Sequence, residues 1–137
     1  NNKKAGQIIT INNLDQILWP DHCIKDSKGS EFSEKLDSHK IHKIFYKGVD
    51  SNIDSYSGFY DNGKIRSTGL SNFLKKNNIN QVDIVGLATD YCVKYSSIDA
   101  YNEGFKTNVL RFCVRGISVE TTETAFKEMK DIGIFII

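Results

Sequence analysis

The feature that most constrains the fold is a regular alternation of apolar runs and amphipathic segments from residue 40 to the C-terminus. Runs with the composition of strands alternate with segments whose apolar residues recur at helical spacing. We expect strands at 40–48, 81–88, 107–116 and 134–137, and helices at 71–78, 93–104 and 120–133. This alternation predicts an α/β protein with three layers, in which helices cover both faces of a parallel sheet.

The stretch GLATDYC at residues 86–92 follows strand 81–88, which is apolar enough to be buried on both faces. It turns through Thr89 and Asp90 and places Cys92 where the next helix begins. Backbone amides at the start of a helix favour an anion and therefore stabilise a thiolate. We predict that Cys92 is a nucleophile; the alternative is a thiol that only packs in the core.

Two further groups are expected beside Cys92. Lys47 ends strand 40–48, so it falls at the carboxyl edge of the sheet, where α/β folds gather their chemistry. An ammonium there favours the thiolate, whereas the alternative is a strand-end lysine in water. The turn that begins at Leu87 can direct the amides of Ala88 and Cys92 at one point, as an oxyanion hole requires.

The stretch LWPDHC at residues 18–23 is the second unusual one. Trp19 is large and rigid enough to wall a pocket for an aromatic ligand, and His22 can bind a metal through its imidazole. The alternative for His22 is a hydrogen-bonded structural histidine. Tyr56 lies in an aromatic-rich stretch, 54–62, that suits either a core or a pocket. Cys23 and Cys113 are expected to be packing residues.

Composition excludes several classes of protein. A formal net charge of +1 offers no global field for nucleic acid or a membrane surface, and no apolar run approaches the ~18 residues of a membrane span. The 137 residues suit a single domain. Three cysteines, an odd count without a recognisable signal peptide, favour a reducing, cytoplasmic setting.

Taken together, these stretches resemble the nicotinamidase family of the isochorismatase-like cysteine hydrolases. The segments LWPDHC, YKGVDSNIDSYSGFYDN and VDIVGLATDYCVK occur in the family's order and spacing, and the resemblance runs from about Leu18 to the C-terminus. It implies an amidohydrolase that cleaves the carboxamide C–N bond of nicotinamide, giving nicotinate and ammonia in NAD salvage. The resemblance also implies activity on pyrazinamide.

The resemblance assigns roles to residues of this chain. It implies that Cys92 is the nucleophile, which forms a thioester acyl-enzyme, and that Lys47 is the catalytic lysine. The Leu87–Ala88 peptide matches a bond that is cis in the family, an arrangement that directs the Ala88 amide into the oxyanion hole beside that of Cys92. Both residues of this peptide are also expected to contact substrate.

Further roles concern the pocket. The resemblance implies that Trp19 and Tyr56 are its aromatic walls. It also implies that His22 is one ligand of a divalent metal, zinc or iron. The family's catalytic Asp and its D-x-H metal motif have no match before Leu18. We therefore expect residues 1–137 to be the C-terminal two-thirds of one domain, without its N-terminal strands, and expect an upstream segment to supply the missing groups.

Two rival functions remain open. Another cysteine hydrolase of the same superfamily would act on a different small amide. A non-catalytic binding or assembly protein would keep the fold and lose the reactivity of Cys92. The resemblance also leaves a homo-oligomer open.

Overall fold

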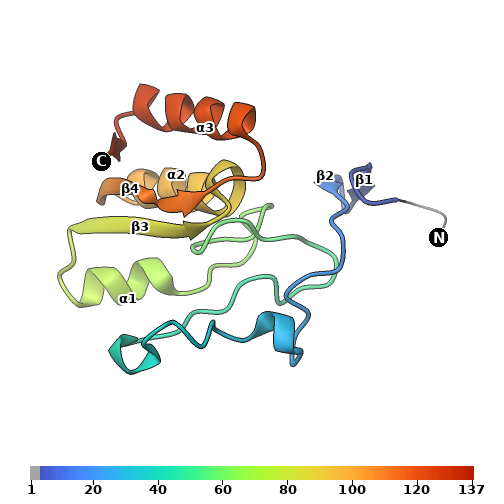
Figure 1. Ribbon diagram of the computed structural model, residues 1–137, viewed down its shortest axis with the longest axis horizontal. Helices are drawn as coiled ribbons and strands as arrows, with labels where there is room; N and C mark the ends of the chain where they lie inside the picture. Colours follow the sequence, from blue (N-terminus) through green and yellow to red (C-terminus); the bar gives the residue numbers. More distant parts are fainter. Residues whose placement is uncertain (1–3) are drawn as a thin grey trace. The chain divides into compact units, whose positions relative to one another are not determined.

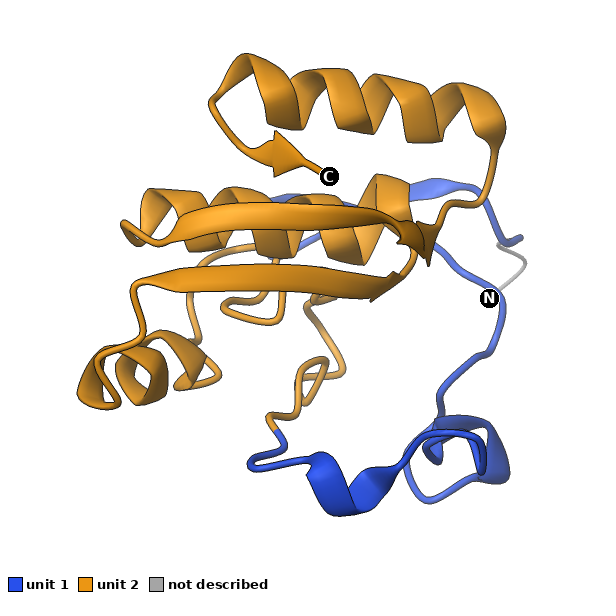
Figure 2. Cartoon of the chain, turned by 60° about the vertical axis from the view of Figure 1, so that its left-hand side comes forward, with its two compact units in different colours: residues 1–44 blue, residues 45–137 orange. Residues whose placement is uncertain are grey.

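The computed structural model describes residues 4–137. The chain divides into two compact units, unit 1 (residues 1–44) and unit 2 (residues 45–137), which Figure 2 shows in different colours. The expectation that residues 1–137 form a single domain stays a prediction.

Unit 1 contains a β-hairpin that the apolar pattern did not predict. Strand β1 (Ile8–Ile11) pairs antiparallel with β2 (Leu14–Ile17). Asn12 and Asn13 connect the strands with φ of 54° and 61°, the left-handed conformation that a two-residue hairpin turn requires and that Asn tolerates. Two short 3-10 helices follow, at Lys28–Ser30 and Ser38–Lys40.

Unit 2 holds a three-stranded parallel sheet with strand order β3-β4-β5 (Figure 1). The strands are β3 (Gln81–Leu87), β4 (Lys106–Arg115) and β5 (Phe135–Ile136). The helices are α1 (Leu70–Lys76), α2 (Lys94–Asn102) and α3 (Val119–Asp131). The three expected helices and the α/β class with a parallel sheet are confirmed.

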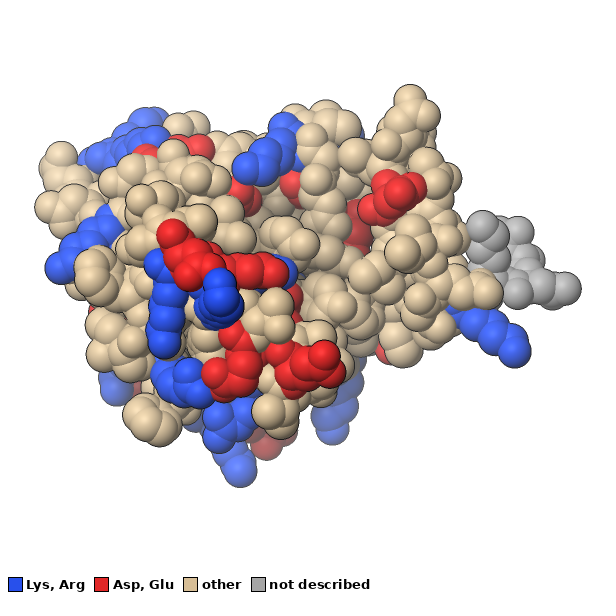
Figure 3. Space-filling model, turned by 90° about the horizontal axis from the view of Figure 1, so that it is seen from above, with Lys and Arg blue, Asp and Glu red and all other residues tan. Residues whose placement is uncertain are grey.

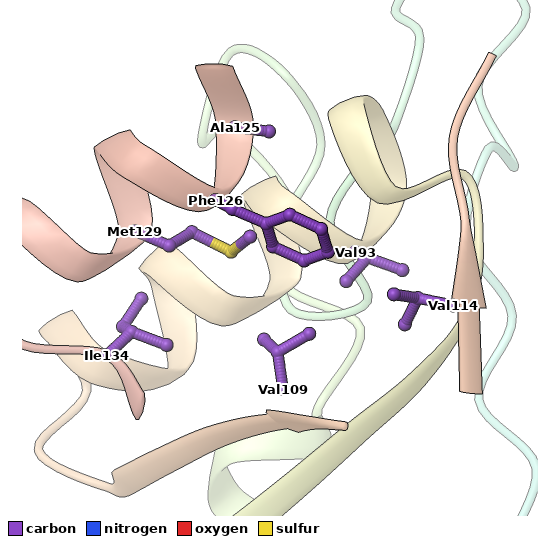
Figure 4. Packing of buried hydrophobic residues seen from close by; sticks show 7 residues of the cluster. All are labelled: Val93, Val109, Val114, Ala125, Phe126, Met129 and Ile134. Carbon is purple, nitrogen blue, oxygen red and sulfur yellow. The ribbon is translucent and has the colours of Figure 1, made fainter. Parts of the chain in front are cut away.

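Helix α3 shows how the sequence specifies these elements. Ser118 caps its N-terminus by accepting a hydrogen bond from the Thr121 amide at 3.1 Å, and Glu120 lies in the first turn, where the helix dipole favours a negative charge. Its apolar side packs into a core that also draws on β4 and on the segment before α2 (Figure 4). The buried members are Val93, Val109, Val114, Ala125, Phe126, Met129 and Ile134.

The prediction that strand 81–88 is buried on both faces is wrong. Burial alternates along β3: Val82 and Ile84 are half-buried against the core, whereas Val85 is 54% and Leu87 71% exposed. Phe112 of β4 is 89% exposed as well. All three helices contribute to cores that include the inward residues of β3, so the helices of unit 2 do not form the third layer expected on the other face.

The prediction of a strand at 40–48 is also wrong. Residues 41–50 run in irregular backbone, and none of the described residues forms a ladder with them. Apolar composition raises strand propensity, but a strand exists only where a neighbour accepts and donates its backbone hydrogen bonds. Phe45 instead packs edge-on against Phe73 of α1, with ring centroids 5.4 Å apart.

The last strand is shorter and less buried than expected. Strand β5 comprises two residues, of which Phe135 is 57% exposed. Ile134, just before the strand, is the residue that enters the core, at 2% exposure. The expected burial of 134–137 is therefore confirmed only in part.

Surface charge follows the balanced composition. Basic and acidic side chains are interspersed on the face that Figure 3 shows. Across residues 4–137, every helix is too short or too polar to cross a lipid bilayer.

Candidate active site

Cys92 lies directly beyond the carboxyl end of β3, as the sequence predicted. The Leu87–Ala88 peptide is cis, and a π-helix, Thr89–Val93, follows it and continues into α2. The Ala88 carbonyl accepts hydrogen bonds from the amides of Tyr91 at 3.1 Å and Val93 at 3.0 Å. Cys92 stands between these two residues, half-buried, with a free thiol.

Lys47 lies beside this thiol although it belongs to irregular backbone. Its Nζ is 3.6 Å from Sγ of Cys92. The same ammonium donates a hydrogen bond of 2.5 Å to the carbonyl oxygen of Ser55. The two contacts hold a positive charge beside the Cys92 sulfur, an arrangement that suits the nucleophilic role expected of this residue.

Asp90 fixes the π-helix to the start of α3. The side chain is 4% exposed, and both of its oxygens accept from the Ile117 amide, at 3.1 and 3.2 Å. Oδ2 also accepts from the Thr121 hydroxyl at 2.5 Å. Asp90 is therefore a structural anchor for the turn that carries Cys92, a role that its position in a turn did not reveal.

Tyr56 belongs to an aromatic group beside the π-helix. Its ring lies 5.4 Å from that of Tyr91, edge-on, and 5.3 Å from that of Tyr95. Tyr91 adjoins Cys92 in the sequence, so Tyr56 is close to the elements that position the thiol. This placement suits the pocket wall that the resemblance implies.

Trp19 and His22 belong to unit 1. Trp19 is half-buried, and His22 is exposed, with Nδ1 at 2.7 Å from the carbonyl oxygen of Pro20. That contact leaves Nε2 as the nitrogen able to bind a metal. Within residues 4–137, no three His, Cys, Asp or Glu side chains are grouped closely enough to hold a metal ion. The described residues therefore do not fit a complete metal site.

The expectation that Cys23 and Cys113 pack in a core is wrong. Both side chains are exposed. Cys23 adopts a φ of 49°, a left-handed turn conformation, and Cys113 lies near the irregular pairing between β3 and β4. Both positions turn the side chain to solvent, so neither thiol can be assumed inert in a labelling experiment.

The family model of the isochorismatase domain matches residues 9–137. The chain belongs to the isochorismatase family. Nicotinamidase from Escherichia coli (strain K12) is 38% identical to it over 125 residues, which are 90% of this chain and 59% of that protein. This member of the isochorismatase family thus spans about three-fifths of the length of that curated relative.

Solved structures agree with the isochorismatase fold. A nicotinamidase–pyrazinamidase from Acinetobacter baumanii is similar with a TM-score of 0.94 at 36% identity, covering 99% of this chain and 66% of its own. A pyrazinamidase from Pyrococcus horikoshii, in complex with zinc, is similar with a TM-score of 0.75 at 36% identity. That match covers 87% of this chain and 62% of the other.

One member of the site has no sequence signature. Ser55 contributes its backbone carbonyl to Lys47, and any residue carries such a carbonyl. The aromatic richness of 54–62 pointed to the segment but not to this atom. For this isochorismatase-family chain, the structure brings together Lys47, Cys92 and the cis Leu87–Ala88 peptide, with Tyr56 nearby.

Proposed function

We propose that this chain carries the nucleophile of a nicotinamidase, an amidohydrolase that converts nicotinamide to nicotinate and ammonia. The observation that carries the proposal is the 3.6 Å contact between Lys47 Nζ and Cys92 Sγ at the carboxyl end of β3. The matched relatives named as nicotinamidases and pyrazinamidases support the substrate class. We further propose that units 1 and 2 belong to one domain, because the family match runs through both.

The proposed reaction proceeds through a thioester. The Cys92 thiolate, stabilised by the Lys47 ammonium, attacks the carboxamide carbon, and the carbonyl π electrons move to oxygen. The Ala88 and Cys92 amides donate to this oxyanion, each contributing about 3 kcal/mol to lowering the barrier. The nitrogen takes a proton from solvent water as the C–N bond breaks, and it leaves as ammonia. A second water adds to the thioester and the C–S bond breaks. Nicotinate and the thiolate are released, and the two protons of the added water pass to solvent, which restores the proton used for ammonia.

Substrate binding is proposed to use aromatic walls. Tyr56 would stack near the pyridine ring, and Trp19 and Leu87 would contribute further apolar contact. His22 is proposed as one ligand of a divalent metal, with zinc or iron as the candidates; the zinc-bound pyrazinamidase supports zinc. Because the described residues supply no further grouped ligand, no chemical step above depends on the metal.

The chemistry also bears on the setting in which the protein works. A nucleophilic thiol must stay reduced, and Cys23, Cys92 and Cys113 are all free. We therefore propose a reducing compartment, the cytoplasm. The partner we propose is the small-molecule amide itself, with no role for nucleic acid or a membrane.

The test is a substrate panel on the purified protein and its Cys92→Ala variant. Nicotinamide, pyrazinamide, benzamide and acetamide are incubated in turn, and the acid products and ammonia are quantified. Turnover of the two ring-nitrogen amides, lost in Cys92→Ala, is the expected result. Preference for acetamide would instead indicate another small-amide hydrolase. A protein without turnover whose Cys92 is no more reactive than a free thiol would indicate a binding function.

A further inference from the structure

Lys47 needs support to stay beside Cys92, because its side chain is exposed and long. The support that the structure shows is the Ser55 carbonyl, which accepts from Nζ at 2.5 Å. Ser55 is itself 3% exposed, so its backbone is held inside the unit. What fixes Ser55 therefore also fixes the position of the ammonium relative to the thiol.

Ser55 is held by Asp54, whose Oδ1 accepts from the Ser55 amide at 2.7 Å, and by Tyr60. The Ser55 hydroxyl donates to the Tyr60 carbonyl oxygen at 3.2 Å and lies 3.3 Å from the Ser57 carbonyl oxygen. Tyr60 in turn donates its phenolic hydroxyl to Oε1 of Glu103. The segment 55–60 thus contacts the Lys47 ammonium at Ser55 and the Glu103 carboxylate at Tyr60, and between them the Gly58 amide donates to Ser96 Oγ of α2 at 2.9 Å.

Glu103 caps the C-terminus of α2, the helix that begins just after Cys92. Its second oxygen, Oε2, accepts from the Ser71 hydroxyl and from Lys75 Nζ, both at 2.6 Å and both from α1. The contacts therefore close a ring. One path from Cys92 runs along α2 to Glu103, and the other returns through Tyr60, Ser55 and Lys47 to the same sulfur.

We propose that Tyr60 and Glu103 are positioning residues for the Lys47–Cys92 pair, acting by holding the Ser55 carbonyl where it directs the ammonium at the thiol. This inference rests on the proposed role of Lys47. It gives a role to the polar cluster around Glu103. This cluster lies away from the thiol and takes part in none of the proposed chemical steps.

The cluster keeps one protonation state over the range in which a thiol titrates. Hydrogen bonds from Lys75, Ser71 and Tyr60 lower the pKa of Glu103 to about 2, so the carboxylate stays ionised. The hydrogen bond to Glu103 raises the pKa of Tyr60, so its hydroxyl stays a donor.

Other charges near the thiol in sequence are engaged elsewhere: Asp90 accepts from the start of α3, and Lys94 pairs with Glu128. Lys47 is the charged side chain whose contact with the thiol the structure shows.

The experiment measures the rate of Cys92 alkylation by iodoacetamide between pH 6 and 10. The background carries Cys23→Ser and Cys113→Ser, because both of these thiols are exposed. The variants are Tyr60→Phe, Lys47→Ala and the two combined. Tyr101→Phe is the matched control, since it makes the same chemical change on α2 at a ring that lies against Gly133.

The expected result is a coupling between the two sites. Tyr60→Phe slows alkylation at pH 7 by about threefold or more and leaves the high-pH plateau unchanged, whereas Tyr101→Phe changes neither. In the Lys47→Ala background, Tyr60→Phe has no further effect. A role in general stability would instead alter alkylation equally with and without Lys47.

Three outcomes would overturn the inference. A Tyr60→Phe profile identical to that of the parent removes Tyr60 from the site while leaving the role of Lys47 intact. An equal effect in both backgrounds shows that Tyr60 acts without Lys47. A Lys47→Ala profile identical to that of the parent overturns both this inference and the Lys47 role in the proposed function. If Tyr60→Phe does not fold, Ser55→Ala breaks the same path at the Tyr60 carbonyl and is judged by the same coupling.

Discussion

The Lys47 ammonium lies 3.6 Å from the Cys92 sulfur, although 45 positions separate the two residues in the sequence. Lys47 comes from an irregular segment and Cys92 from a π-helix that follows a strand. Neither local conformation brings the pair together. The contact depends on how segment 45–60 is held against α2, so activity should respond to changes in that segment as well as in the pair.

Replacement of the thiol should abolish hydrolysis. Cys92→Ala removes the atom that bonds to the carboxamide carbon, so we expect turnover to fall by about 10³-fold or more. Because Cys92 is only half-buried, the far-UV circular dichroism of the variant should match that of the parent. Near-normal nicotinate production by a folded Cys92→Ala protein would refute the thioester route.

Replacement of the ammonium should cost less than loss of the thiol. Lys47→Ala leaves the nucleophile in place but removes the positive charge that favours its thiolate form. Alkylation of Cys92 at pH 7 should therefore slow, with the rate recovering as pH rises towards 10. Profiles that coincide in parent and variant would exclude Lys47 from the site.

Loss of the Asp90 carboxylate should destabilise unit 2. Asp90→Ala leaves the Ile117 amide and the Thr121 hydroxyl without their buried acceptor, which we expect to lower the free energy of unfolding by about 2 kcal/mol. Urea denaturation measures this change. Asp131→Ala is the control, because its pair with Lys127 is exposed and should leave the urea midpoint unchanged. Equal midpoints for the two variants would contradict the anchoring role.

Glu103 should confer a pH-dependent part of the stability. Hydrogen bonds from Lys75, Ser71 and Tyr60 lower its folded-state pKa to about 2, from an ordinary glutamate value of 4.5. The stabilisation is therefore fully present above about pH 4.5 and is lost as pH falls towards 2. Urea denaturation of the parent and of Glu103→Gln should show a constant stability difference from pH 7 to pH 5 that narrows by pH 3. A difference independent of pH would mean that Glu103 has the same pKa in the folded and unfolded states.

Metal titration tests the assignment of His22. A catalytic site for a divalent ion normally takes three or more protein ligands, and residues 4–137 group no such set. We expect zinc to bind this 137-residue chain weakly, without a saturable one-to-one step in calorimetry. Tight one-to-one binding that His22→Ala removes would show that the chain completes the site by itself.

The sequence predicted best what depends on local periodicity. The three helices, strands 81–88 and 107–116 and the place of Cys92 follow from apolar spacing and turn residues, and all were found. The contact between Lys47 and Cys92 was predicted because both residues were expected at the carboxyl edge of the sheet. Lys47 is in fact not on a strand. The Asn12–Asn13 hairpin was overlooked, but its signal is in the sequence, because paired Asn residues suit a two-residue turn.

The features that could not be predicted depend on contacts between segments that are distant in the sequence. An apolar stretch such as 40–48 becomes a strand only where another strand pairs with it. The exposure of Val85 depends on which elements cover the sheet, and the exposure of Cys113 on the local strand pairing. The Ser55 carbonyl is an acceptor that no side chain identifies, and the link from Tyr60 to Glu103 joins positions 43 apart in the sequence.

The bare face of β3 and β4 has a consequence for how substitutions there would be tolerated. Leu87 and Phe112 are already hydrated in the folded state, at 71% and 89% exposure, so little of their apolar surface is removed from water when residues 4–137 fold. Exchanging Phe112 for a polar residue should leave the midpoint of thermal unfolding almost unchanged and should raise the solubility of the chain. The folding of residues 4–137 therefore does not require an apolar side chain at position 112.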